Sequence, residues 1–145
     1  MIKLRSEQLD HMQQQDPERF VAQIAEHLRE LHETTFPDST LQRMVKLGLA
    51  RARSHGLHSD AQLLAFVSLM YEIAPNFDQQ PLIRRILEDT SQPIDVRWEL
   101  LFDDSAELLA AWDQADTGDF YDGTVWFPEA NEQDPDADLD AAGDA

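Results

Sequence analysis

Two of the five histidines, His55 and His58, form an HxxH pattern, which is the spacing in this chain closest to a metal-binding motif. Two ligands three residues apart hold zinc only when a third protein ligand reaches the same point with suitable geometry. The pair spans an expected helix break, and no cluster of further ligands adjoins it in sequence. We therefore expect a surface-loop or capping role for both histidines, and no metal site.

Carboxylates are abundant, with 29 Asp and Glu residues, but abundance does not define a catalytic pair. Acid–base catalysis needs two carboxyls in unlike environments, so that one keeps a raised pKa. The sequence brings no particular pair together, and it has no cysteine, no phosphate-binding glycine loop and no GxSxG nucleophile motif. The chain is expected to be non-enzymatic and without a cofactor. The alternative is an enzyme with an unrecognised carboxylate site.

The charge is distributed unevenly along the chain. Residues 1–97 contain all 11 Lys and Arg residues and 14 acids, whereas residues 98–145 contain 15 acids and no Lys, Arg or His. A base-free acidic region repels nucleic-acid phosphate and anionic lipid and attracts basic protein surfaces. We expect a protein partner, such as a basic effector or toxin, and neither nucleic acid nor membrane. An acidic mimic of nucleic acid is a further alternative.

Within the acidic region, residues 116–128 combine aromatic side chains with acids and glycines. Aromatic residues dominate the energetic centres of protein interfaces. The segment either folds back over the helices or stays exposed as a hydrophobic anchor for a basic partner. We expect its aromatic residues to be the partner-binding residues, and these are Phe120, Tyr121, Trp126 and Phe127.

The elements that must position these residues are helices. Apolar residues recur every three or four positions between turn signals, and no run alternates as a strand would. Asp16-Pro17-Glu18 is typical of a helix start, and His55-Gly56 is typical of a helix end. The helices are expected over residues 6–14, 16 to 34–36, 39–55, 61–73, 81–87, 93–102 and 105–114.

The helical pattern predicts an all-α fold, a compact bundle of about six or seven helices with an acidic, partly disordered C-terminal tail. We divide the chain into a helical domain over 1–115, the aromatic-acidic segment 116–128 and a disordered acidic tail over 129–145. The stretch Leu63–Met70 is apolar nearly all round, so its helix should be central. Trp98, Phe102 and Trp112 fit helical stripes and are expected in the core.

No apolar run is long enough to span a bilayer, and the N-terminus lacks the apolar stretch of a secretory signal. These two features and the lack of cysteine agree with a cytoplasmic protein.

Several short stretches, mainly packing and capping positions, carry a family resemblance. They are Leu4–Gln8, Phe20, His27–Arg29, Phe36-Pro37, Gly48–Ala52, His55–Leu57, Ser59-Asp60, Phe66-Val67, Leu69-Met70, Pro75–Asp78 and Ile86–Asp89. Over about residues 1–90 the chain resembles small helical proteins encoded beside bacterial type VI secretion effectors. The resemblance implies an accessory role as an adaptor, chaperone or immunity partner, and it supplies no catalytic residues.

Two modes of action follow from these expectations. An immunity protein would use its acidic, aromatic end to block a basic toxin site. An adaptor or chaperone would hold an effector segment in an apolar groove between helices.

Overall fold

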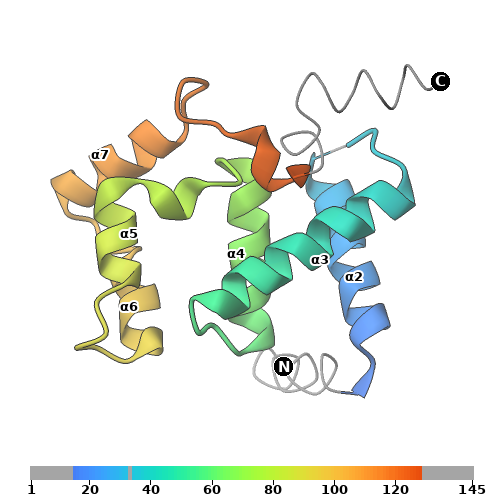
Figure 1. The fold of residues 1–145 in the computed structure, drawn as a ribbon, viewed down its shortest axis with the longest axis horizontal. Coiled ribbons are helices and arrows are strands. Elements are labelled where there is room, and N and C mark those ends of the chain that lie inside the picture. Colours follow the sequence, from blue (N-terminus) through green and yellow to red (C-terminus); the bar gives the residue numbers. More distant parts are fainter. Residues whose placement is uncertain (1–14, 33, 129–145) are drawn as a thin grey trace.

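A computed structural model describes residues 15–32 and 34–128, and every regular element in these ranges is a helix (Figure 1). The all-α prediction is therefore confirmed. The helix expected over 6–14 and the tail over 129–145 lie outside the described residues. The α-helices are α2 (Pro17–His32), α3 (Asp38–Ser54), α4 (Asp60–Glu72), α5 (Pro81–Leu87), α6 (Ile94–Leu100) and α7 (Ala106–Ala115), and the 3-10 turns are η1 (Phe77–Gln79) and η2 (Gly123–Val125).

The junction of α2 and α3 is held by a side chain that the sequence did not single out. Helix α3 begins at Asp38, one residue before the predicted start, and Pro37 occupies the N-cap position without a side-chain hydrogen bond. Arg29 instead reaches across the turn, donating to the Phe36 carbonyl at 2.9 Å and to the Asp38 carboxylate at 2.6 Å. One guanidinium thus satisfies a loop carbonyl and an acid in the first turn of α3.

Helices α3 and α4 pack closely because Gly48 has no side chain. A Cβ at this position would lie 3.0 Å from Val67 and 3.2 Å from the Met70 sulfur. Helix α3 ends at Ser54, and the turn that follows contains Gly56, whose φ of 94° suits glycine. Ser59 and Gln62 form a capping box that starts α4.

Helix α4 is central, as its uninterrupted apolar sequence predicts (Figure 1). Helices α2 and α3 cover one side of it, while η1 and α5–α7 lie on the other. Phe66 of α4 touches Phe77 and Trp98, with ring centroids 4.9 and 6.1 Å away. Among the described residues, no helix is long and apolar enough to cross a membrane.

A closed ring of aromatic contacts joins α4 to the α6–α7 arm. Phe77 stacks on Trp112 at 5.5 Å, Trp112 on Phe102 at 5.9 Å, and Phe102 meets Trp98 edge-on at 5.2 Å. The Trp112 indole also donates to the Leu101 carbonyl at 2.8 Å, so that α7 is fixed against the end of α6. Phe66 closes this ring by its contacts with Phe77 and Trp98.

The core position expected for Phe102 is wrong, because this residue is exposed, as are Leu31 and Leu109. Helix α6 ends at Leu100, so Phe102 leaves the helical phase of Trp98 and buries only part of its ring. In α7 the buried stripe is Leu108, Ala111 and Ala115, and Leu109 projects about 100° away from it. Leu31 lies in the last turn of α2, where the chain leaves towards α3.

Candidate functional site

The aromatic segment 116–128 folds back onto the helices. Trp126 is 3% exposed and belongs to the core, where its ring contacts Tyr71 of α4. Phe127 is half-buried, with Phe36 at 6.2 Å and the Arg43 guanidinium 5.9 Å from its ring centroid. Phe120 is also packed against the core. Of the two arrangements that the sequence allowed, the structure adopts the folded one.

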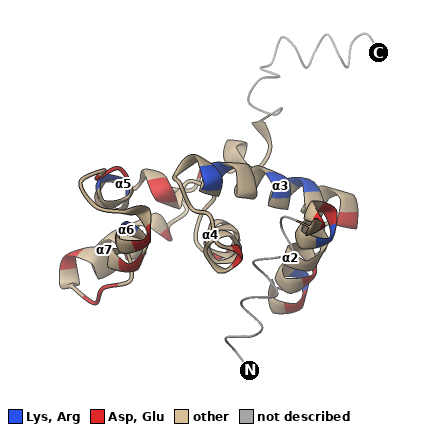
Figure 2. Cartoon of the chain, turned by 90° about the horizontal axis from the view of Figure 1, so that it is seen from below, with Lys and Arg blue, Asp and Glu red and all other residues tan. Residues whose placement is uncertain are grey.

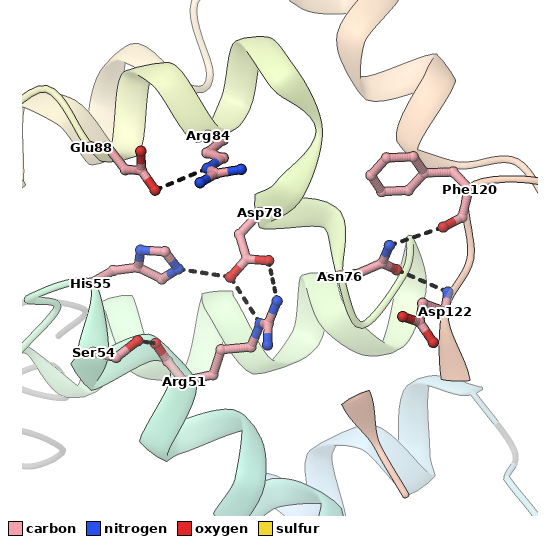
Figure 3. A network of polar contacts seen from close by, with 9 residues as sticks. All are labelled: Arg51, Ser54, His55, Asn76, Asp78, Arg84, Glu88, Phe120 and Asp122. Atoms are coloured by element: carbon pink, nitrogen blue, oxygen red, sulfur yellow. Dashed lines mark hydrogen bonds and ion pairs between the residues drawn. The ribbon is translucent and has the colours of Figure 1, made fainter. Parts of the chain in front are cut away.

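The side chain of Asn76 holds this segment in place by two hydrogen bonds to its backbone (Figure 3). Its side-chain amide donates to the Phe120 carbonyl at 2.9 Å, and its side-chain oxygen accepts from the Asp122 N–H at 3.0 Å. The side chain of Asn76 is buried, so both of its polar ends need partners. The clamp therefore ties residues 120–122 to the start of η1.

Tyr121 is the one predicted partner-binding residue that the fold leaves largely open, at 49% exposed. Burial of the rest of the ring raises the pKa of its hydroxyl, which a hydrogen bond with the Trp126 side chain only partly offsets. The four aromatic residues named from the sequence thus do not form one exposed anchor. Three of them pack on the core, and Tyr121 remains available at the surface.

A second polar centre lies where α3 ends against η1 (Figure 3). Asp78 is buried and accepts two hydrogen bonds from the Arg51 guanidinium, at 2.7 and 2.9 Å. The same carboxylate lies 2.7 Å from His55 Nε2. Burial opposes the ionisation of Asp78, but the hydrogen bonds and positive charge of His55 and Arg51 outweigh it, so the pKa of Asp78 is lowered.

Asp78 borders an open pocket of about 350 Å³. His55 faces Asp78 with Nε2, and Figure 3 shows its other ring nitrogen, Nδ1, on the side of Glu88. Glu88 itself pairs with Arg84 across one helical turn at 3.0 Å. The pocket therefore combines a histidine, two carboxylates and two guanidinium groups, and its lining is Arg51, Ser54, His55, Asp78, Gln79, Arg84 and Glu88.

The two histidines of the HxxH pattern do not converge on one point. His55 faces Asp78, whereas His58 Nε2 lies 3.2 Å from Asp95 at the start of α6. Across residues 15–32 and 34–128, no three His, Cys, Asp or Glu side chains are grouped as metal ligands would be. His58 also has a turn role, because its backbone N–H donates to Gln62 beside the capping box.

The bend between α6 and α7 is the surface that sequence reasoning missed. We call residues 99–109 the acidic-apolar elbow. Its exposed apolar side chains are Leu100 at 44%, Phe102 at 52% and Leu109 at 54%. Among the described residues, six large hydrophobic side chains are exposed, and three of them fall in these eleven positions. This concentration distinguishes the elbow from scattered surface leucines, which are ordinary.

Acids alone supply the charge of the elbow. Its exposed charged residues are Glu99, Asp103, Asp104 and Glu107. Figure 2 shows Lys and Arg along α3 but only Asp and Glu among the charged residues of α7. The signal that could have revealed the elbow is present in the sequence, because Leu109 lies outside the stripe of Leu108, Ala111 and Ala115.

Comparison with protein-family models, with curated proteins and with solved structures found no match to this chain. The family resemblance over residues 1–90 therefore stays an expectation.

Proposed function

We propose that the chain is a non-enzymatic, protein-binding accessory of a bacterial secretion or toxin effector, acting in the cytoplasm as an adaptor, chaperone or immunity partner. The setting comes from the family resemblance. The binding role rests on the structure of the acidic-apolar elbow.

The observation that carries the proposal is the exposure of Leu100, Phe102 and Leu109 within eleven residues. These three side chains lie on the end of α6, the following turn and the start of α7, and exposed apolar side chains concentrated in a short segment are typical of protein interaction sites. Phe102 is also held in place by Trp98 and Trp112, so that a partner would meet a pre-ordered aromatic surface. Tyr121 is kept as a second candidate contact because it is the exposed member of the aromatic segment.

Co-expression with the product of the adjacent effector gene tests this function directly. We expect a complex that co-purifies with the tagged wild-type chain and is lost with the double variant Leu100→Gln, Leu109→Gln. The matched control is Leu31→Gln, which changes an equally exposed leucine on α2. A complex that survives the double variant but is lost with Tyr121→Ser would transfer the site to residues 116–128. Absence of any complex would contradict the proposal.

A second candidate function is an enzyme that uses the pocket beside Asp78. The observation that favours it is the His55–Asp78 contact at 2.7 Å on the wall of an open pocket. A carboxylate that orients a histidine is the arrangement of a general base. Asp78 also receives both hydrogen bonds from Arg51, which is the arrangement of a structural ion pair. This second feature is the reason that binding, not catalysis, is the leading proposal.

The enzyme alternative is tested with the full chain and a panel of activated ester and phosphodiester substrates. If His55 is a base, turnover should fall with His55→Gln and should be retained with His58→Gln. Turnover that is absent in the wild type, or equal in both variants, would leave Asp78, Arg51 and His55 with a structural role alone.

A further inference from the structure

The proposed function leaves open what kind of protein segment the elbow receives. Resting on that function, we propose that the acidic-apolar elbow docks a basic amphipathic helix of the partner, with apolar residues on Leu100, Phe102 and Leu109 and Lys or Arg on the surrounding acids.

The helical preference follows from the backbone of the elbow. The backbone of α6 and α7 is engaged in helical hydrogen bonds, and Ser105 caps α7 by accepting from the Leu108 N–H at 3.2 Å. The described residues contain no strand, so the elbow has no open edge to which an extended peptide could add. Recognition must therefore run through side chains, as when a helix places its apolar face in a groove.

The basic preference follows from the charge of the elbow. Four acids of the elbow are exposed, and they are Glu99, Asp103, Asp104 and Glu107. The last basic residue in the chain is Arg97. Arg97 is turned towards the α5–α6 connection, where it donates to the carbonyls of Leu87 and Gln92. An acidic or neutral helix would leave the four carboxylates uncompensated, whereas a basic one complements them.

The same charge selects against other occupants. Anionic lipid and nucleic-acid phosphate are repelled by an elbow with no base. A second copy of this chain would bring its own net charge of −18 to the contact, which opposes association. The amphipathic partner helix thus satisfies both the apolar and the electrostatic character of the surface.

The direct test uses synthetic helices of about 15 residues, long enough to place three turns on the elbow. One peptide carries leucines on one face and lysines on the other. A second has the same composition in scrambled order, and a third replaces every lysine with glutamate. We expect the first peptide to bind, the scrambled one to bind at least about tenfold more weakly, and the glutamate one not to bind. Equal binding of the first two would overturn the proposal.

Two sets of variants locate the binding. The double variant Leu100→Gln, Leu109→Gln should bind the leucine–lysine peptide at least about tenfold more weakly than the wild type. The control Leu31→Gln should bind it with unchanged affinity. Both changes are at exposed positions, and circular dichroism checks that the helices are retained. Equal weakening by Leu31→Gln would contradict docking at the elbow.

Neutralising the elbow acids distinguishes specific binding of the basic peptide from its general attraction to an acidic chain. Changing the four elbow acids to their amides should flatten the dependence of affinity on salt between about 0.02 and about 0.3 M. The control changes four acids outside the elbow to Asn, so that its net charge equals that of the elbow variant. These acids are Asp134, Asp136, Asp138 and Asp140. An equal effect of both sets would show nonspecific attraction and would overturn the proposal. A dimer that light scattering finds in the wild type and not in the leucine variant would identify a second copy as the occupant, and it would overturn the proposal as well.

Failure of this inference is distinguishable from failure of the proposed function. If the natural partner is lost with the leucine variant but its affinity does not respond to the four acids, the elbow is an interface for a neutral partner. The function then stands and the basic helix is rejected. If neither the leucine variant nor the acid variant changes the affinity for the natural partner, the proposed site is rejected as well.

Discussion

The two sides of α4 differ in how completely their apolar residues are buried. On the α2–α3 side, the buried stripe of α2 closes against α3 and α4, and Gly48 brings the helices into close contact. On the other side, the α6–α7 arm buries Trp98, Leu101 and Leu108 but leaves Leu100, Phe102 and Leu109 exposed. The first side carries both signs of charge, and α7 carries only acids (Figure 2).

This difference indicates a division of labour. The α2–α4 side uses its apolar residues for the core, and its cations hold the turns, as Arg29 does at the start of α3. The α6–α7 arm needs only part of its apolar surface to stay attached, because the aromatic ring through Phe66 and Phe77 already fixes it. Leu100 and Leu109 take no part in this ring and stay exposed.

The largest expected effect comes from breaking the connection between the two sides. Phe66→Ala removes a fully buried ring that touches His55, Phe77 and Trp98. The free energy of unfolding should fall by about 3–5 kcal/mol, since a large cavity is left in the core. Urea denaturation followed by tryptophan fluorescence measures this. The control Phe102→Ala changes the exposed member of the same ring and should lose only about 1 kcal/mol. Equal losses would contradict the central role of Phe66.

The buried ion pair should have the next largest effect. Asp78→Asn leaves the Arg51 guanidinium without its counter-charge, and the free energy of unfolding should fall by about 3 kcal/mol. The control is Glu88→Gln, which breaks an exposed pair with Arg84 and should cost about 0.5 kcal/mol or less. A loss for Asp78→Asn as small as that of the control would show that the buried pair does not fasten α3 to η1.

The same variant has a defined pH dependence. The folded-state pKa of Asp78 is lowered, so its stabilising contribution is complete above the unfolded-state pKa and is lost as the pH falls through the folded-state pKa. The difference in unfolding free energy between wild type and Asp78→Asn should be fully present at about pH 5 and shrink in more acidic solution. Denaturant titrations across this range measure it. A difference that grows on acidification would contradict the lowered pKa.

A smaller and more local effect is expected at the clamp on the aromatic segment. Asn76→Ala removes both hydrogen bonds to residues 120–122, for a loss of about 2 kcal/mol. Amide hydrogen exchange should accelerate over residues 120–127 and stay unchanged in α3. The control Thr124→Ala removes only an exposed turn bond to Asp122. Unchanged exchange in Asn76→Ala would mean that Trp126 alone holds the segment.

The contrast between the clamp and the helices shows what the sequence could predict. Helix positions followed from short-range signals, since Pro17, Gly56 and Ser59 act on their own neighbours. The centrality of α4 followed from its apolar composition. These features depend on local chemistry, which the order of residues displays directly.

The contacts of the alternating polar residues Asn76, Asp78 and Gln80 could not be predicted in this way. Each of these buried side chains reaches a different element, and the nearest partner outside its own turn lies 23 or more residues away. Which residue meets which depends on the tertiary fold. The exposure of Phe102 was missed for a related reason, because it depends on α6 ending two residues earlier.

The smallest expected effect on stability is at the elbow. Leu109→Ala removes a side chain that is 54% exposed, so the free energy of unfolding should change by less than about 0.5 kcal/mol. Its neighbour Leu108 belongs to the buried stripe, and Leu108→Ala should cost about 2–3 kcal/mol. Thermal and urea unfolding of both variants decide the matter. If Leu109→Ala destabilised the chain as much as Leu108→Ala, Leu109 would be part of the fold, and the elbow would lose one of the three apolar side chains on which the proposed binding surface rests. If it does not, its side chain contributes little to folding, and a loss of partner binding in the same variant would be a direct effect on the interface.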